Sequence, residues 1–342
     1  MPYILLFTIF IISQYNNVWY FSDKMVLKRP VFSQDIMSRL RPLNACDNYH
    51  GIFSVLHDWF IVFGCIIVNN WLMKYNFYLG LLFYIVSLLA IAGRMRGLSS
   101  LLHESTHRAL AKWKLLNDIL GSVLSGWCVL QSWTGYHYQH VVLHHPHLGD
   151  ADKDPDYKQF LQTGLYDEGT TRADVIDYLT NIPSPRSTVL YVQYLIKDRI
   201  FPKSEKGFET VLRISFWAAV VIALYETGNM KNFLIYWVIP MLTTANWIGN
   251  IAEILEHFPL LRYKGADELH SSRNKFCGTI GDFLFNPHGD EYHLLHHLFG
   301  RIPHWNYKKA HDILMEDENY RSVNQCKIGL VPQLQDMLSH FD

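Results

Sequence analysis

The stretch Asn286-Pro-His288-Gly-Asp-Glu-Tyr-His293-Leu-Leu-His296-His297 holds four of the 18 histidines of the chain, three of them within five residues. A packed core cannot satisfy so many neighbouring imidazoles unless a charge or a metal ion is present. We therefore interpret His293, His296 and His297 as metal ligands. The remaining chain must then fold so that further ligands reach the same place.

Two earlier clusters supply such ligands, namely His103-Glu-Ser-Thr-His107 and His140-Val-Val-Leu-His144-His145. Residues four apart share one face of a helix, so His103 and His107 can bind one ion. A helix that carries His140, His144 and His145 can bind two metals from adjacent faces. Together the three clusters offer at least eight imidazoles, whereas a single zinc takes three or four ligands. This favours a pair of first-row metals, although imidazole alone does not identify the element.

Composition narrows the class of protein. Hydrophobic residues make up 49% of the chain and are strongly clustered, which favours one membrane-embedded unit. A net charge of -1 argues against a nucleic-acid partner. The cysteines form no Cys-x-x-Cys pair, which excludes a zinc ribbon or a cysteine-held iron–sulfur cluster and predicts reduced thiols. These cysteines are Cys46, Cys65, Cys128, Cys277 and Cys326.

Four apolar segments are candidates for membrane spans. Ile52–Met73 and Phe77–Gly93 are joined by a brief polar connection, which predicts an antiparallel helical hairpin. Val211–Tyr225 and Phe233–Ile251 predict a second hairpin of the same kind. Basic residues precede both hairpins, so the positive-inside rule places the ends of each in the cytoplasm.

The segment Leu115–Trp133 has the length of a span but contains several polar residues and glycines. A single crossing here would put the first and second histidine clusters on opposite sides of the membrane. We therefore interpret it as a re-entrant or interfacial helix. The alternative is a fifth span with unrelated histidine groups. We also expect Arg94 and Arg96 to close the helix that begins at Phe77.

The predicted fold is all-α: a multi-pass integral membrane protein with four transmembrane helices in two hairpins and a cytoplasmic helical cap that holds a di-metal site. We expect an N-terminal cytoplasmic segment at residues 1–50, a membrane domain at 51–310 and a C-terminal cytoplasmic tail at 311–342. The apolar run Tyr3–Ile12 is short for a span and lacks the basic leader of a signal peptide. We assign no role to residues 1–24.

A polar stripe lies at the end of the last predicted span. Asn250, Glu253 and His257 follow an i, i+3, i+7 pattern and so share one helix face. Ionisable groups at the end of a membrane helix are costly unless they are paired or bound to a metal. We predict that His257 is a metal ligand, that Asn250 and Glu253 are catalytic residues, and that Glu256 supports a ligand.

The three boxes, His103-x3-His107, His140-x3-His144-His145 and His293-x2-His296-His297, resemble those of the membrane fatty acid desaturase and hydroxylase superfamily. The resemblance covers about residues 50 to 310. It implies a cytoplasmic-facing centre of two ferrous ions that uses O2 to remove hydrogen from an unactivated C–H bond. It also implies a fatty acyl or other lipid substrate, and a separate cytochrome b5 or ferredoxin system with its reductase as electron donor.

Departures from the family pattern leave the chemistry open. Acyl-CoA desaturases carry Asn-x-x-x-His near the last span, where this chain has Glu253 and His257. One alternative is therefore a lipid or small-molecule hydroxylase or oxidative decarboxylase of the same superfamily. Another is a membrane zinc metalloprotease, because His103-Glu104-x-x-His107 also fits that signature with Glu104 as general base. A non-enzymatic receptor or scaffold is disfavoured by three intact boxes.

Overall fold

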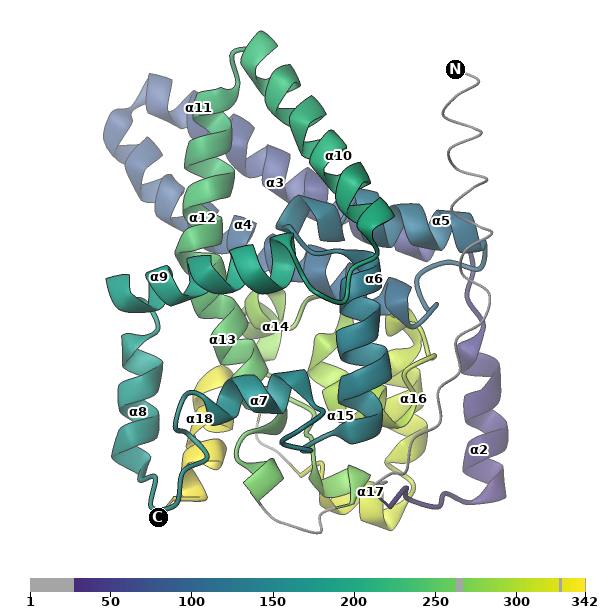
Figure 1. Ribbon diagram of the computed structural model, residues 1–342. Helices are drawn as coiled ribbons and strands as arrows, with labels where there is room; N and C mark the ends of the chain where they lie inside the picture. The colour runs from purple at the N-terminus through teal and green to yellow at the C-terminus, as the bar shows by residue number, and fades with distance from the viewer. Residues whose placement is uncertain (1–27, 263–266, 326–327, 342) are drawn as a thin grey trace.

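The computed structural model describes residues 28–262, 267–325 and 328–341, and it contains helices and no strand in these ranges. The all-α prediction is confirmed. Figure 1 shows the long helices at one end of the molecule and short helices, among them α7, α15 and α16, gathered at the other. The four cysteines in the described ranges are free thiols. Tyr3–Ile12, the remainder of residues 1–24, and Cys326 lie outside the described residues.

The first predicted hairpin is formed by α3 (His50–Tyr75) and α4 (Phe77–Thr106), which pack against each other along their length. Asn76 ends the first helix and caps the second, because its side-chain oxygen accepts from the backbone N–H groups of Tyr78 and Leu79. Gly80 allows the close approach of the two helices, since a Cβ there would lie 2.8 Å from the backbone of Met73.

Helix α4 does not end at Gly93, and the prediction that Arg94 and Arg96 close it is wrong. The helix continues to Thr106 and so carries the first histidine box. Both guanidinium groups are retained inside the helix because they have buried carboxylate partners. Arg94 donates to Asp58 at 2.9 Å, and Arg96 donates to Glu256 at 2.7 Å.

The second predicted hairpin is only partly continuous. Helix α10 (Gly207–Glu226) joins α3 and α4 as the three helices of the described residues that are long and apolar enough to cross a membrane. The segment Phe233–Ile251 is interrupted, because Thr243 has non-helical angles (φ -121°, ψ -87°) and Pro240 lacks a backbone N–H. Its pieces are α11 (Met230–Phe233), the π-helix η7 (Leu234–Val238), α12 (Ile239–Leu242) and α13 (Thr244–His257).

The segment Leu115–Trp133 contains no helix of span length. It forms α5 (Lys114–Asp118), the π-helix η2 (Ile119–Val123) and the 3-10 helix η3 (Gly126–Val129), followed by α6 (Trp133–Tyr136). Asn117 ties this segment to the end of α4, since its amide donates to the carbonyl oxygen of Ser105 at 2.9 Å. Whether the segment is re-entrant or interfacial stays a prediction.

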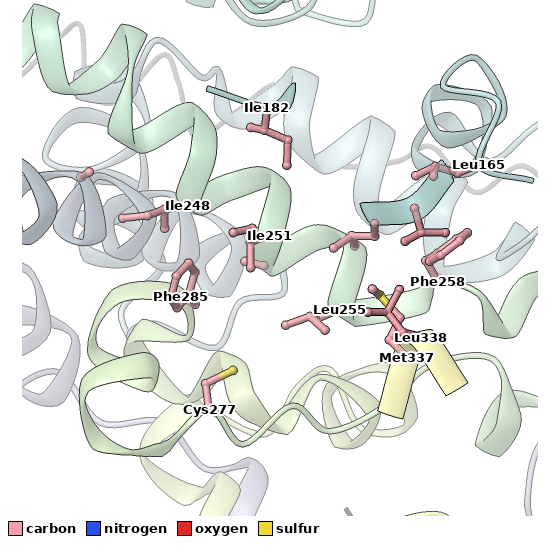
Figure 2. Packing of buried hydrophobic residues seen from close by; sticks show 14 residues of the cluster. Leu165, Ile182, Ile248, Ile251, Leu255, Phe258, Cys277, Phe285, Met337 and Leu338 are labelled. Carbon is pink, nitrogen blue, oxygen red and sulfur yellow. The ribbon is translucent and has the colours of Figure 1, made fainter. Parts of the chain in front are cut away.

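Helix α13 lies at the centre of the largest buried cluster (Figure 2). Its apolar face, with Ile248, Ile251 and Leu255, packs against residues of α8 (Arg172–Asn181), α14 (Gly278–Phe285) and α18 (Leu330–Ser339). Burial of that face turns the opposite stripe, which includes Asn250, Glu253 and His257, toward the histidine cluster and its cavities. The polar stripe predicted from the sequence therefore lies on one face of α13, opposite the buried apolar face.

A second buried cluster holds α15 (His293–Leu298). Leu294 and Leu295 are fully buried against α2 (Gln34–Leu40), α16 (Tyr307–Leu314) and α17 (Glu318–Ser322). Since the leucines occupy this side of the short helix, the histidines of the third box face the other side. The remaining helices are α7 (Pro155–Leu161) and α9 (Pro185–Tyr194).

A buried ion pair joins the first hairpin to the chain just before the third box. Asp58 of α3 is 0% exposed, accepts from Arg94 of α4, and lies 2.8 Å from Nε2 of His288. We predict that Asp58→Asn lowers stability by about 3–5 kcal/mol, because it leaves a buried guanidinium without its counter-charge. Thermal unfolding of the purified protein in detergent measures the change.

The matched control is Asp312→Asn, which removes an exposed ion pair with Lys308. Such pairs contribute about 0–1 kcal/mol, so this variant should unfold close to the parent temperature. If Asp58→Asn unfolds no earlier than the control, the pair does not hold the hairpin in place.

Candidate metal centre

The fold brings together all nine histidines predicted as ligands. The first box lies at the end of α4, and the second box lies on the π-helix η4 (His137–His144) and the following 3-10 helix η5 (His145–His147). His257 ends α13, and the third box forms most of α15. Seven of the nine side chains are buried, and His107 and His145 are partly buried.

One group contains five of these rings, whose ligand nitrogens all lie within 4.8 Å of one another: His103, His107, His140, His145 and His296. In four of these rings the Nε2 atoms face each other. The distance is 2.8 Å from His103 to His296, 3.0 Å from His140 to His145 and 3.1 Å from His145 to His296. The five-residue interval between His140 and His145 suits a π-helix, in which residues i and i+5 are aligned.

The other group contains His144, His257 and His297, again within 4.8 Å of one another. His293 adjoins it, with its Nε2 atom 3.1 Å from the Nε2 atoms of both His257 and His297. The second box is thus divided between the two groups: His140 and His145 belong to the five-ring group, and His144 belongs to the group with His257 and His297. That division is the arrangement expected of a box that serves two metals.

The geometry of the rings fits a metal pair. A first-row metal bonds an imidazole nitrogen at about 2.1 Å, and two such bonds at right angles place the nitrogens about 3.0 Å apart. The Nε2 atom of His107 is buried and has no hydrogen-bond partner, as expected of an atom that bonds an ion. A donor set made only of imidazoles suits ferrous iron among other first-row metals.

Groups behind the rings fix their orientation. Nδ1 of His144 lies 2.9 Å from a carboxylate oxygen of Asp154, and Nδ1 of His257 donates to the carbonyl oxygen of Ser271 at 2.9 Å. Each outward N–H bond leaves the Nε2 lone pair pointing inward, toward the other histidines.

Glu104 supports the cluster through Tyr307. The phenol hydroxyl of Tyr307 donates to one oxygen of Glu104 at 2.7 Å and lies 3.0 Å from Nδ1 of His296. The other oxygen of Glu104 accepts from the backbone N–H of His304 at 3.0 Å. A protease general base needs a carboxylate that faces the metal-bound water, whereas both oxygens here are engaged. The geometry therefore opposes the metalloprotease alternative.

Burial keeps most of these imidazoles neutral, which is the form that binds a metal. Burial is the main cause that lowers the pKa well below its usual value for His107, His140, His145, His293, His296 and His297. Burial likewise lowers the pKa of His257 to about 4. In His144 the effect of burial is outweighed by the carboxylates of Asp154 and Asp156, which raise the pKa to about 9.

A buried ionic network holds the first box, His257 and the third box in register. Lys275 is 0% exposed and donates to Glu256 at 2.7 Å and to Asp290 at 3.0 Å, and Arg96 donates to the same two carboxylates. Burial alone would raise the pKa of Glu256, but Lys275 and Arg96 hold it at about 2. The network joins α4, α13 and η10 (Pro287–Tyr292), which lead to the first box, to His257 and to the third box.

The two residues predicted as catalytic lie beside the rings rather than among them. Glu253 belongs to no histidine group, and its carboxylate lies 3.6 Å from Arg96. Asn250 accepts from the hydroxyl of Tyr178 at 3.1 Å. His288, the histidine just before the third box, contacts Asp58 and belongs to neither group. The catalytic roles of Asn250 and Glu253 stay predictions.

Two sides of the cluster are open to cavities. An inner cavity of about 120 Å³ reaches His103, His140, His144, His257 and His293. It shares lining residues with an outer cavity of about 230 Å³. A separate cavity of about 620 Å³ reaches the other edge of the cluster at His107, His145 and His297.

The sequence did not identify several residues that support the site. Tyr307 and Lys275 carry no recognisable signal, because their partners are far away in the chain. Ser271 acts through a backbone carbonyl, which no side-chain pattern reveals. Asp154 had a signal, since it lies in the acidic stretch that follows the second box.

Comparison with known proteins agrees with this geometry. Residues 79–326 match the family model described as fatty acid desaturase. The dihydrorhizobitoxine desaturase of Bradyrhizobium elkanii is 30% identical over 313 residues, which cover 87% of this chain and 84% of that protein. The sn-1 acyl-lipid omega-3 desaturase (ferredoxin) of Nostoc sp. (strain 36) is 24% identical over 220 residues, 61% of this chain and 60% of that protein. The chain therefore belongs to the fatty acid desaturase family.

Proposed function

We propose that this protein is an O2-dependent oxidoreductase that holds two ferrous ions and converts a C–C single bond of its substrate into a double bond. The observation that carries the proposal is the convergence of nine histidines in two groups, with facing Nε2 atoms 2.8–3.1 Å apart. Membership of the desaturase family supports the oxidoreductase class.

The five-ring group would hold one iron, and His144, His257, His293 and His297 would hold the other. When bound, the metal pair would activate O2, and O2 would supply the oxidising power that breaks two C–H bonds of the substrate. The chain itself orients the rings through Tyr307, Asp154 and the carbonyl of Ser271, and its burial of the cluster excludes bulk water.

The balance of the reaction requires an external reductant. The substrate gives up two hydrogens, and O2 takes them together with two electrons and two protons to form two waters. We propose a separate ferredoxin or cytochrome b5 system as the donor, and the Nostoc relative is named as ferredoxin-dependent. The cavity at His107, His145 and His297, flanked by Arg29 and Arg301, offers the donor a route to the cluster that the substrate does not use.

We further propose that the protein is a multi-pass membrane protein whose hairpins begin and end in the cytoplasm, with the metal centre on that side. Residues 51–310 would form the membrane catalytic domain, 1–50 a cytoplasmic segment and 311–342 a cytoplasmic tail. The three apolar helices support membrane insertion, and the basic residues that precede both hairpins support the cytoplasmic side. A fatty acyl or other lipid substrate is the expectation from the family, while the relative from Bradyrhizobium elkanii is named for dihydrorhizobitoxine.

Metal analysis tests the proposal directly. The full chain, expressed with iron and purified in detergent, should contain two irons, and a chelator should remove both. His296→Ala and His297→Ala alter different groups, so each should lower the iron content, while the exposed His270→Ala should not. A single zinc ion in the parent protein would contradict the proposal.

Product analysis separates desaturation from hydroxylation. In cells that express the protein under 18O2, a desaturase yields a product lighter by two hydrogens, with the label in water. A hydroxylase yields a product that carries the label. We expect the unlabelled, dehydrogenated product, and mass spectrometry of both the lipid and the water-soluble fractions measures it. Labelled product would assign the chain to the hydroxylase alternative.

Tyr307→Phe tests the support behind His296. The change keeps the aromatic ring but removes the hydroxyl that links His296 to Glu104. Loss of such a partner lowers metal affinity or activity by about 10–100-fold. The effect is measured as the retention of iron during dialysis. The control is Tyr292→Phe, which removes a hydroxyl from the tyrosine ring next to Tyr307. Equal retention by the two variants would show that the hydroxyl is dispensable.

A further inference from the structure

The inner cavity beside the histidine cluster is lined almost entirely by polar side chains. Of the residues that line it in the described part of the chain, only Phe160 and Pro202 are apolar. The others include serines, glutamines and tyrosines as well as five carboxylates and two guanidinium groups. A lipid without charges near its reacting carbons could not pair with these groups, whereas a small molecule that carries its own charged groups could.

Most of the charges in this lining are already paired. Arg96, Glu256 and Asp290 neutralise one another together with Lys275. Asp156 lies 3.3 Å from Nδ1 of His144. These groups therefore shape the wall of the cavity and have little capacity left for a ligand.

Three charged groups of the lining remain available. The guanidinium of Arg199 contacts the hydroxyl of Tyr194 at 3.3 Å. It forms no ion pair within 4 Å in the described residues, and the charge of Glu253 acts on it from farther away. The carboxylate of Asp198 has no ion pair there either. Glu253 has only its 3.6 Å contact with Arg96, and its side chain is 40% exposed.

Arg199 and Glu253 occupy the junction of the inner and outer cavities, because both residues line both spaces. Arg199 belongs to the π-helix η6 (Leu195–Ile200), and Glu253 projects from the polar stripe of α13. A guanidinium recognises a carboxylate with two parallel N–H bonds, and a carboxylate recognises an ammonium group. The junction thus offers one binding group for each charge of a zwitterion.

We propose, on the basis of the function proposed above, that the substrate is a small amino acid with a free ammonium and a free carboxylate group, rather than an acyl lipid. Its carboxylate binds Arg199, and its ammonium binds Glu253 with Asp198 nearby. Since both charges sit on one carbon, the rest of the molecule extends into the inner cavity toward His103 and His140. The bond to be oxidised then lies next to the metal ligands.

Ligand-dependent thermal stabilisation tests this proposal without turnover. The iron-loaded full chain in detergent is heated with unbranched L-α-amino acids such as norleucine, and with hexanoate and pentylamine, which lack the ammonium and the carboxylate respectively. Oleoyl-CoA and oleoyl phosphatidylcholine complete the series. We expect the amino acids to raise the melting temperature and the other compounds to do so less. Greater stabilisation by the oleoyl compounds, or equal stabilisation by the single-charge analogues, would overturn the proposal.

Variants assign the two charges. Arg199→Gln should abolish the extra thermal stabilisation that the amino acid gives relative to pentylamine, and Arg199→Lys should recover part of it. Glu253→Gln should abolish the extra stabilisation that the amino acid gives relative to hexanoate. Lys197→Gln, an exposed neighbour that lines neither cavity, should behave like the parent. If the advantages survive in both variants, the assigned residues are wrong. A protein that holds two irons but prefers lipid refutes only this inference, whereas a protein without iron refutes the proposed function.

Discussion

The structure depends on one constraint, which is that nine largely buried imidazoles turn nitrogen toward nitrogen at the centre of the fold. A neutral imidazole has one N–H, and in at least three of these rings Nδ1 meets an outer partner rather than the cluster. The inward lone pairs would repel one another in the absence of a cation. The proposed metal pair would remove that repulsion, so the cluster and its ions would together form a single structural unit.

The surrounding charges serve this unit. The network of Arg96, Glu256, Lys275 and Asp290 keeps three elements at fixed positions relative to each other: helix α4, the polar stripe of α13 and the third box. Asp58 holds α3, the other helix of the first hairpin, in place through its ion pair with Arg94 of α4. These buried ions act together with the two apolar clusters around α13 and α15 to hold the ligand segments in place.

Spacing alone was sufficient to find the nine histidines and the stripe that ends at His257, because both patterns are local. The end of α4 was not predictable in this way, since Arg94 and Arg96 stay helical only through carboxylates 36 and 160 residues distant. The π-helix of the second box was also missed, and with it the pairing of His140 with His145. Tyr307 and Ser271 were missed because their contacts depend on tertiary structure.

The polar character of the cavity has a further consequence for how such proteins diverge. The histidines come from α4, the second box, α13 and α15. Arg199 lies in a different part of the chain, the segment that contains α8, α9 and η6. Residues of this segment are mostly exposed or half-buried. Replacement of side chains in this segment changes none of the nine histidines. If Arg199 selects the substrate as proposed, the recognised molecule can therefore change without any change in the segments that carry the histidines.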